Sequence, residues 1–443
     1  MNKRIKDSPR SAFSDFAAPV AATVGAVILL AAVAFSSLVT AQTRSANLAS
    51  ITGQVLSANG KPVGGALVIL ETSDGRAPHS THTDDKGNFS FPNLRPGLYD
   101  LHAQAGEKWS EWQHNLAAHA GQPTEITLRL TLQKPPAAAV PQVRLTGKIR
   151  EWAIPVENSL PHDPAVDPSG NVWLTLQRAN QIARFNPKTA QWKLFLSPTQ
   201  NSGPHGITSD ARGIIWYTEN SAGKIARLDP ATGAILEYAT LKATDPHTPI
   251  FGPDGALWFT AQQANLIGRL DTETAAIQEY RVPTPNARPY GIVNGPDGAL
   301  WFCEFGANKL GRIDVKTGAI TEFATPLPEE RPRRLTVVGQ MIYFTDFAAG
   351  HLGRFDTEHF SFKDWPSPSG DRSEPYGIVA DSSGDIWYCE FSANQLVHFS
   401  PNSETFQRFT LPSAKSEVRN MVRDSTGRLW LALSGANKVA VVE

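Results

Sequence analysis

The stretch "GPHGITSDARGIIWYTENSAGKIARLDPATGAILEYAT", residues 203–240, is one complete copy of the unit that decides the fold. Its apolar and β-branched residues form four short runs, HGITS, IIWYTE, KIARLD and AILEYA, separated by turns of the Asp-x-x-Gly and Pro-x-Thr-Gly kind. One aromatic residue per unit recurs at intervals of 42 to 44 residues, at Trp173, Trp216, Trp258, Trp301, Tyr343, Trp387 and Trp430. Four strands per unit and seven units predict an all-β protein in which residues 146–443 form a seven-bladed β-propeller.

The way the ring closes is also visible in the sequence. The seventh unit stops after its third run, NKVAVVE, at the C-terminus. The segment TGKIREWAIP (146–155) matches TGAITEFATP (317–326), which is the fourth run of another unit. We therefore expect residues 146–155 to complete the last blade, so that no open sheet edge remains at the seam.

A second β-rich segment precedes the propeller. Its strands alternate between apolar and polar residues and are joined by turns such as Asn59-Gly60 and Lys86-Gly87. The pieces GKPVGGALV (60–68), TDDKGNFSF (83–91) and LRPGLYDL (94–101) resemble the carboxypeptidase regulatory-like domain. This resemblance implies a small non-catalytic β-sandwich at residues 50–132. A Pro/Ala-rich linker, 133–145, then leads to the propeller.

The N-terminus has the composition of an export signal. Lys3, Arg4, Lys6 and Arg10 precede an apolar stretch that runs from Phe16 to the small residues ending at Ala41. This pattern predicts a signal peptide over residues 1–41 and a periplasmic or extracellular protein. The alternative is an uncleaved anchor, since the apolar stretch is long enough to span a bilayer.

Charge and cysteine content exclude several functions. Lys plus Arg (41) nearly balances Asp plus Glu (42), so a nucleic-acid partner is not expected. Cys303 and Cys389 occupy equivalent positions two units apart, too far for a disulfide between stacked sheets. We expect a monomer whose partner is a small molecule or glycan bound at the channel mouth.

One position in each unit concentrates polar side chains. It begins the innermost strand and holds, in order, His162, His205, His247, Tyr290, Arg333, Tyr376 and Arg419. These side chains are predicted to ring one mouth of the central channel as a ligand site. A three-residue hairpin loop would set His205 opposite Glu219 and Tyr290 opposite Glu304, adding both glutamates to the site. The alternative is that these polar groups only face water or tie blades together.

The units also resemble those of the virginiamycin B lyase (streptogramin B lyase) family, as in PTPNARPYGIVNGPDGALWFCEFGANKLGRID (283–314). The resemblance implies elimination at the ester of a cyclic depsipeptide, with Mg²⁺ held by two carboxylates, a histidine base and a second histidine from the preceding blade. In SEPYGIVADSSGDIWYCE (373–390) it implies Glu374 and Glu390 as metal ligands. Tyr376 stands where the base belongs, and Arg333 stands where the second histidine belongs.

The tyrosine changes the expected chemistry. A phenol has an ordinary pKa near 10 and is a poor base at neutral pH without strong tuning. His205 and His247 are therefore additional acid/base candidates. Together with His162 they also form a possible site for another divalent metal such as zinc, if neighbouring blades bring them close enough.

Two functional hypotheses follow. The first is a metal-dependent lyase acting on a cyclic ester or depsipeptide, with His205, His247 and Tyr376 as catalytic candidates. The second is a non-catalytic propeller that binds a small ligand, glycan or protein. A calcium-dependent lactone hydrolase ranks behind both, because its Glu/Asn/Asp metal set is not evident in the sequence.

Overall fold

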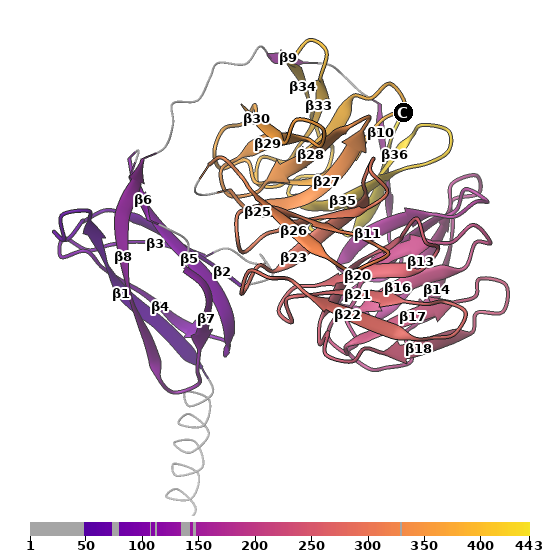
Figure 1. Cartoon of the computed structure of the whole chain (residues 1–443), viewed down its shortest axis with the longest axis horizontal. Helices are drawn as coiled ribbons and strands as arrows, with labels where there is room; N and C mark the ends of the chain where they lie inside the picture. Colours follow the sequence, from indigo (N-terminus) through magenta and orange to yellow (C-terminus); the bar gives the residue numbers. More distant parts are fainter. Residues whose placement is uncertain are drawn as a thin grey trace, which may run out of the picture. The chain divides into compact units, whose positions relative to one another are not determined.

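The computed structural model describes residues 48–72, 79–106, 108–110, 113–133, 142–144, 148–327 and 330–443. The predicted export signal and most of the predicted linker lie outside the described residues. In the described part no helix is long and apolar enough to cross a membrane. The regular elements are strands, which confirms the all-β class (Figure 1). The chain divides into two compact units.

The N-terminal unit is built on one hydrogen-bonded system of eight strands. Their order is β3-β2-β5-β6-β8-β1-β4, and β7 also pairs with β5. The bounds are β1 (Ala49–Ser57), β2 (Leu67–Thr72), β3 (His79–His82), β4 (Asn88–Leu94), β5 (Gly97–Ala105), β6 (Lys108–Ser110), β7 (Gln113–Ala118) and β8 (Pro123–Gln133). Ile51 and Val55 are fully buried, and so are Val68 and Leu70, because side chains alternate across a strand. The predicted sandwich has its core on these faces.

The C-terminal unit contains the seven predicted blades, each a four-stranded antiparallel sheet. Blade one comprises β11 (Pro161–Val166), β12 (Val172–Leu176), β13 (Gln181–Asn186) and β14 (Gln191–Leu196). Blade two comprises β15 (Pro204–Ser209), β16 (Ile215–Glu219), β17 (Lys224–Leu228) and β18 (Ile235–Ala239). Blade three comprises β19 (Pro246–Phe251), β20 (Leu257–Ala261), β21 (Leu266–Leu270) and β22 (Ile277–Arg281). Blade four comprises β23 (Pro289–Asn294), β24 (Leu300–Glu304), β25 (Lys309–Ile313) and β26 (Ile320–Ala324). Blade five comprises β27 (Pro332–Val338), β28 (Met341–Asp346), β29 (His351–Asp356) and β30 (Ser361–Pro366). Blade six comprises β31 (Pro375–Ala380), β32 (Ile386–Glu390), β33 (Gln395–Ser400) and β34 (Thr405–Thr410). Blade seven comprises β35 (Val418–Arg423), β36 (Leu429–Leu433), β37 (Lys438–Val442) and a strand from the other end of the domain.

That last strand closes the ring as predicted. β10 (Ile149–Ala153) pairs antiparallel with β37 along its whole length, from Ile149 opposite Val442 to Ala153 opposite Lys438. A further short strand, β9 (Gln142–Arg144), pairs in parallel with β34 and makes blade six the only described five-stranded blade. β9 and β10 follow each other in the chain but are therefore hydrogen-bonded into different blades, blade six and blade seven.

The Asp-x-x-Gly turn explains the aromatic repeat. Asp210 accepts bonds of 2.9 Å from the backbone N–H groups of Arg212 and Ile214, and its own N–H donates to Ile214 O, so the predicted three-residue loop is confirmed. In blade one the turn carboxylate, Asp167, also accepts a 2.8 Å bond from the indole of the fully buried Trp173. The same indole–carboxylate bond recurs at Trp258, Trp301, Trp387 and Trp430. The rings of Trp173, Trp258, Trp301 and Trp430 are thus buried, and that of Trp387 half-buried, without losing their polar partners.

The predicted hairpin register holds next to the turn, from Ser209 opposite Ile215 to Ile207 opposite Tyr217, but is wrong by one residue at the axial end. Pro204, and not His205, lies opposite Glu219, because a β-bulge falls between Pro204 and Ile207. The bulge recurs and places Pro289 opposite Glu304, Pro332 opposite Asp346 and Pro375 opposite Glu390. The extra residue changes which side chains of the first strand share a face with the second strand.

A hydroxyl in the second strand bridges this bulge in several blades, although the bulge also occurs in blade seven, where Ala432 holds that position. Thr218 Oγ1 accepts a 2.9 Å bond from Gly206 N–H and donates a 2.7 Å bond to His247 O of the next blade. Thr175, Thr260 and Thr345 make equivalent bonds. Cys389 Sγ accepts from Gly377 N–H in the same way but donates to Val418 O, one residue before the axial Arg419. Cys389 and Cys303 are both free and buried. One small polar side chain in each of these blades therefore joins it to its neighbour near the axis.

Candidate functional site

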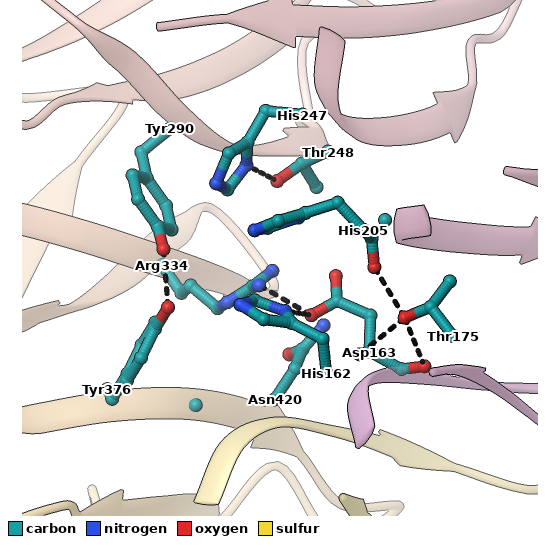
Figure 2. Close-up of polar contacts among 12 residues, drawn as sticks. His162, Asp163, Thr175, His205, His247, Thr248, Tyr290, Arg334, Tyr376 and Asn420 are labelled. Atoms are coloured by element: carbon teal, nitrogen blue, oxygen red, sulfur yellow. Dashed lines mark hydrogen bonds and ion pairs between the residues drawn. The ribbon is translucent and has the colours of Figure 1, made fainter. Parts of the chain in front are cut away.

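The seven side chains predicted to form a ring do lie together on the propeller axis. Each is the second residue of the innermost strand of its blade, and none is more than 5% exposed. The ring centres of His162 and His205 are 3.7 Å apart, those of His205 and His247 are 3.9 Å apart, and those of His247 and Tyr290 are 4.2 Å apart. The burial of all seven side chains shows that they fill the axis, which corrects the expectation that they ring a channel mouth. Figure 2 shows the three histidines, Tyr290 and Tyr376 gathered together.

Three imidazoles, those of His162, His205 and His247, occupy one part of this axial cluster. His162 Nδ1 is 2.9 Å from Asp163 Oδ1, and burial lowers the pKa of His162 to about 3. The ligand atoms of His162, Asp163 and His205 lie within 4.8 Å of one another, which is close enough to hold a transition metal. The blades therefore bring the histidines near each other. Arg334, which donates a 2.8 Å bond to the same Asp163 carboxylate, would oppose a cation there.

Guanidinium groups and phenols occupy the opposite part. The guanidinium carbon of Arg333 lies 3.8 Å from the ring centre of Tyr376 and 5.0 Å from that of Tyr290. Arg334 lies 5.7 Å from the ring centre of Tyr376, and Arg419 is 5% exposed in the adjacent blade. The hydroxyls of Tyr290 and Tyr376 point at each other and share a short hydrogen bond (Figure 2). The axis is thus divided into an imidazole part and an arginine–tyrosine part.

The two phenols are not equivalent. Burial alone would raise the pKa of Tyr376, but the nearby positive charges of Arg333, Arg419 and Arg334 and the Tyr290 hydrogen bond outweigh it, so this pKa lies below the ordinary value. Burial and the neighbouring Tyr376 raise the pKa of Tyr290, although Arg333 opposes this. Tyr376 is therefore the phenol that ionises first, and Tyr290 keeps its proton and donates it to the shared hydrogen bond.

Three phenylalanines enclose the arginine–tyrosine part. Each directly follows the second strand of its blade: Phe305, Phe347 and Phe391. The Phe347 and Phe391 rings lie 6.0 and 5.8 Å from the ring of Tyr376, and Phe305 lies 5.5 Å from Tyr290. Phe305 and Phe347 are buried, whereas Phe391 is half-buried. Phe391 is the member of this layer that solvent reaches.

Two predicted ligand-binding residues, Glu219 and Glu304, do not join the axial cluster. The bulge moves the axial residue out of the position opposite each glutamate. Both carboxyls are fully buried, beside Glu237 and Glu322 on the outermost strands. Burial and then the charge of Glu322 raise the pKa of Glu304 to about 8. These residues are buried acids at the ends of the second strands of their blades.

The sequence reasoning missed Asp163 and Arg334. Each follows an axial residue directly, and the bulge brings both toward the axis, where they form an ion pair across 171 positions of the sequence. A usable signal existed: the same position is Gly206, Gly291 and Gly377 in three other units. Asp163 and Arg334 are the two charged residues at a position that holds glycine in three units and Thr248 and Asn420 in the other two, and this contrast could have drawn attention to them.

Comparison with known proteins places this site in a family. The model of the virginiamycin B lyase family matches residues 128–250 and 237–443, which together exceed half of the chain. The chain belongs to the virginiamycin B lyase family. The carboxypeptidase regulatory-like domain model matches residues 50–131. No curated protein matches the chain significantly.

Solved structures agree with this family. A streptogramin B lyase is 28% identical, with a TM-score of 0.63, and the match covers 67% of this chain and 97% of that one. A virginiamycin B lyase from Staphylococcus aureus is also 28% identical, with a TM-score of 0.63, over 67% of this chain and 98% of that one. A hydrazine synthase from Kuenenia stuttgartiensis, 13% identical over 66% and 97% with a TM-score of 0.56, shares the fold alone.

The family resemblance implies magnesium at Glu374 and Glu390, so their surroundings matter. Glu390 accepts a 2.9 Å bond from Ser369 N–H through Oε1 and a short bond from the same serine's hydroxyl through Oε2. Glu374 Oε2 accepts a short bond from Ser392 Oγ. Carboxylate oxygens suit magnesium, but these could bind it only after giving up serine partners. As they stand the two residues do not fit a magnesium centre, and that site stays a prediction.

Proposed function

We propose that the propeller is an eliminative lyase in which Tyr376 acts as the base and Tyr290 as the acid. The observation that carries this proposal is the geometry at the family's base position. The Tyr376 phenol is hydrogen-bonded to Tyr290 and lies against the Arg333 guanidinium at 3.8 Å. Family membership supports the reaction class, and the lowered pKa of Tyr376 supports its role.

The proposed reaction needs only groups that the chain supplies. Tyr376, as phenolate, takes a proton from the carbon next to a carbonyl. The electron pair forms a carbon–carbon double bond as the C–O bond of the ester breaks. Tyr290 passes its proton to the departing oxygen, and the proton on Tyr376 restores the pair. The guanidiniums of Arg333 and Arg334 stabilise the negative charge that develops on the carbonyl oxygen, a role of fixed positive groups in a dry site.

Access to this site requires the covering layer to open. Tyr376 is 1% exposed, so a substrate has to displace a neighbour to reach its hydroxyl. Phe391, the half-buried member of the layer, is the side chain that can move into solvent at least cost. We expect Phe391→Ala to raise the apparent substrate affinity or turnover, because a smaller side chain leaves the path open.

A turnover assay tests the proposal. Purified protein would be incubated with quinupristin and with a panel of β-acyloxy esters and lactones, and ring-opened or unsaturated products would be followed by mass spectrometry. We expect Tyr376→Phe to lose activity by about 10²-fold or more, as for removal of a general base. Unchanged turnover in Tyr376→Phe, or no product from any substrate of the panel, would contradict it. Calorimetry with Mg²⁺, using Glu390→Gln as control, tests the metal prediction separately.

Ligand binding without chemistry is the second candidate function, and the burial of the axial cluster favours it. All seven axial side chains are nearly inaccessible, as expected if they mainly hold blades together or clamp a ligand permanently. In this case the propeller would bind members of the panel with no product formed. The turnover assay therefore separates the two functions.

A further inference from the structure

We infer that the substrate is an anion: a carboxylate that carries an alkoxy or acyloxy group on its β-carbon. This inference rests on the proposed lyase function and deepens it, because it names the chemical class on which the site acts. It also departs from a neutral cyclic depsipeptide. The carboxylate would be held by Arg334 and Arg419, next to the Tyr290–Tyr376 pair.

The first argument is the charge gathered at the axis. Arg333, Arg334 and Arg419 are 0%, 4% and 5% exposed, and all three act electrostatically on Tyr376. Arg334 is paired with the buried Asp163, whereas Arg419 approaches Glu417 only to 3.8 Å, and the Glu417 side chain is 41% exposed. Burying a guanidinium is costly unless a negative charge compensates it. A bound anion would supply that compensation.

The second argument is that donors remain available. Arg334 Nε and Arg419 Nε are both buried, and neither has a hydrogen-bond acceptor in the part of the chain that the structure describes. A buried N–H without a partner destabilises the fold, so such groups usually serve a ligand or water. Guanidinium groups recognise carboxylates with particular strength, because their planar donors match the two carboxylate oxygens.

The third argument is that nothing on the imidazole side competes for the anion. His162 is neutral, and the Asp163 carboxylate beside it is already paired with Arg334, so this side offers a carboxylate no further positive charge, whereas Arg419 on the arginine–tyrosine side does. The phenol ring of Tyr376 and the ring of Phe347, 3.8 and 4.0 Å from the Arg333 guanidinium, hold that group in a fixed position. The anion-binding region is therefore rigid before the substrate arrives.

The reaction balances with this substrate. Contact with the arginines neutralises the carboxylate and makes its α-hydrogen more acidic, and Tyr376 removes that hydrogen. The electron pair forms the Cα–Cβ double bond while the Cβ–O bond breaks. The leaving oxygen takes the proton of Tyr290, and the proton that Tyr376 has gained moves to Tyr290. The products are an α,β-unsaturated carboxylate and an alcohol or acid, with no oxidant or reductant.

Matched probes test the inference on the full chain. Calorimetry with Tyr376→Phe, which should bind without turnover, would compare 3-acetoxypropanoate with its neutral methyl ester. We expect the carboxylate to bind at least about tenfold more tightly than the ester, and Arg419→Gln to remove this preference. The exposed Arg212→Gln is the control and should keep it. The same comparison on wild-type protein by thermal shift does not depend on how the variants fold.

The outcomes separate this inference from the proposed function. Equal binding of acid and ester, or no binding of the acid, overturns the anion site. Elimination from neutral esters at the same rate as from the acid would leave the lyase standing and remove the anionic substrate. Preferential binding of the acid that Arg419→Gln abolishes, with no acrylate formed by wild-type protein, would support the anion site and contradict the lyase.

Discussion

Removing the hydroxyl of Thr218 should destabilise the propeller strongly, although valine has almost the same shape. The hydroxyl accepts a 2.9 Å bond from Gly206 N–H and donates a 2.7 Å bond to His247 O in the next blade. Thr218 is fully buried, so Thr218→Val leaves one buried donor and one buried acceptor without a partner. Each such group costs about 1–3 kcal/mol, so the two together predict a loss of about 2–6 kcal/mol in the free energy of unfolding.

Urea denaturation followed by tryptophan fluorescence would measure this loss. The chain offers a comparison, because Cys389 Sγ bridges a similar pair of groups, Gly377 N–H at 3.1 Å and Val418 O, one residue before the axial position, at 2.9 Å. Thr218→Cys should therefore lose much less stability than Thr218→Val. If Thr218→Val unfolds at the same urea concentration as wild-type protein, the two hydrogen bonds of the hydroxyl do not stabilise the contact between the blades.

Three further predictions concern buried titratable groups and the seam. Glu304 has a pKa of about 8 in the folded chain against an ordinary value of 4.5, so between these pH values the folded chain keeps a proton that the unfolded chain releases. The free energy of unfolding should therefore fall as pH rises from 4.5 to 8. Glu304→Gln should reduce that fall, measured in thermal melts, by up to about 3–5 kcal/mol. His162, with a pKa of about 3, binds no proton where the unfolded chain does, so stability should fall as pH drops below 6.5, and its imidazole NMR signals should stay constant from pH 8 to pH 4. Removing residues 1–154 should expose the edge of β37 and produce dimers or aggregates in size-exclusion chromatography, whereas removing residues 1–132 should not.

The period of the tryptophans was enough to predict the blades and the closing strand. Both depend on local features, namely turn residues and alternating apolar residues, which recur in every copy. The bulge and the hydrogen bonds across it were not predictable by the same reasoning, because neither is marked by a turn residue or by the alternation of apolar residues, and the bulge recurs in blade seven with Ala432 in place of the threonine. Thr218 looks like an ordinary strand residue until its partner, His247 O, is known.

The sequence predicts where the candidate site lies, but not how buried its side chains are or how their neighbours change their pKa values. Counting strand residues places Tyr376 and His162 on the axis, but it does not show whether the axis is open or filled. That depends on side-chain lengths summed around seven blades, and on the ion pair between Asp163 and Arg334, whose members are far apart in the sequence. The sequence alone likewise describes Tyr376 as a poor base, because its tuning comes from arginines of other blades.

The parallel pairing of β9 with β34 has a mechanical consequence. Three residue pairs, Gln142–Phe406 to Arg144–Arg408, hold the chain against blade six before it continues into β10 of blade seven. A pulling force transmitted along the chain from the preceding domain therefore acts on these three residue pairs before it acts on β10. The outermost strand of blade six, β34, then bears this force, while the hydrogen bonds between β10 and β37 that close the ring stay unloaded.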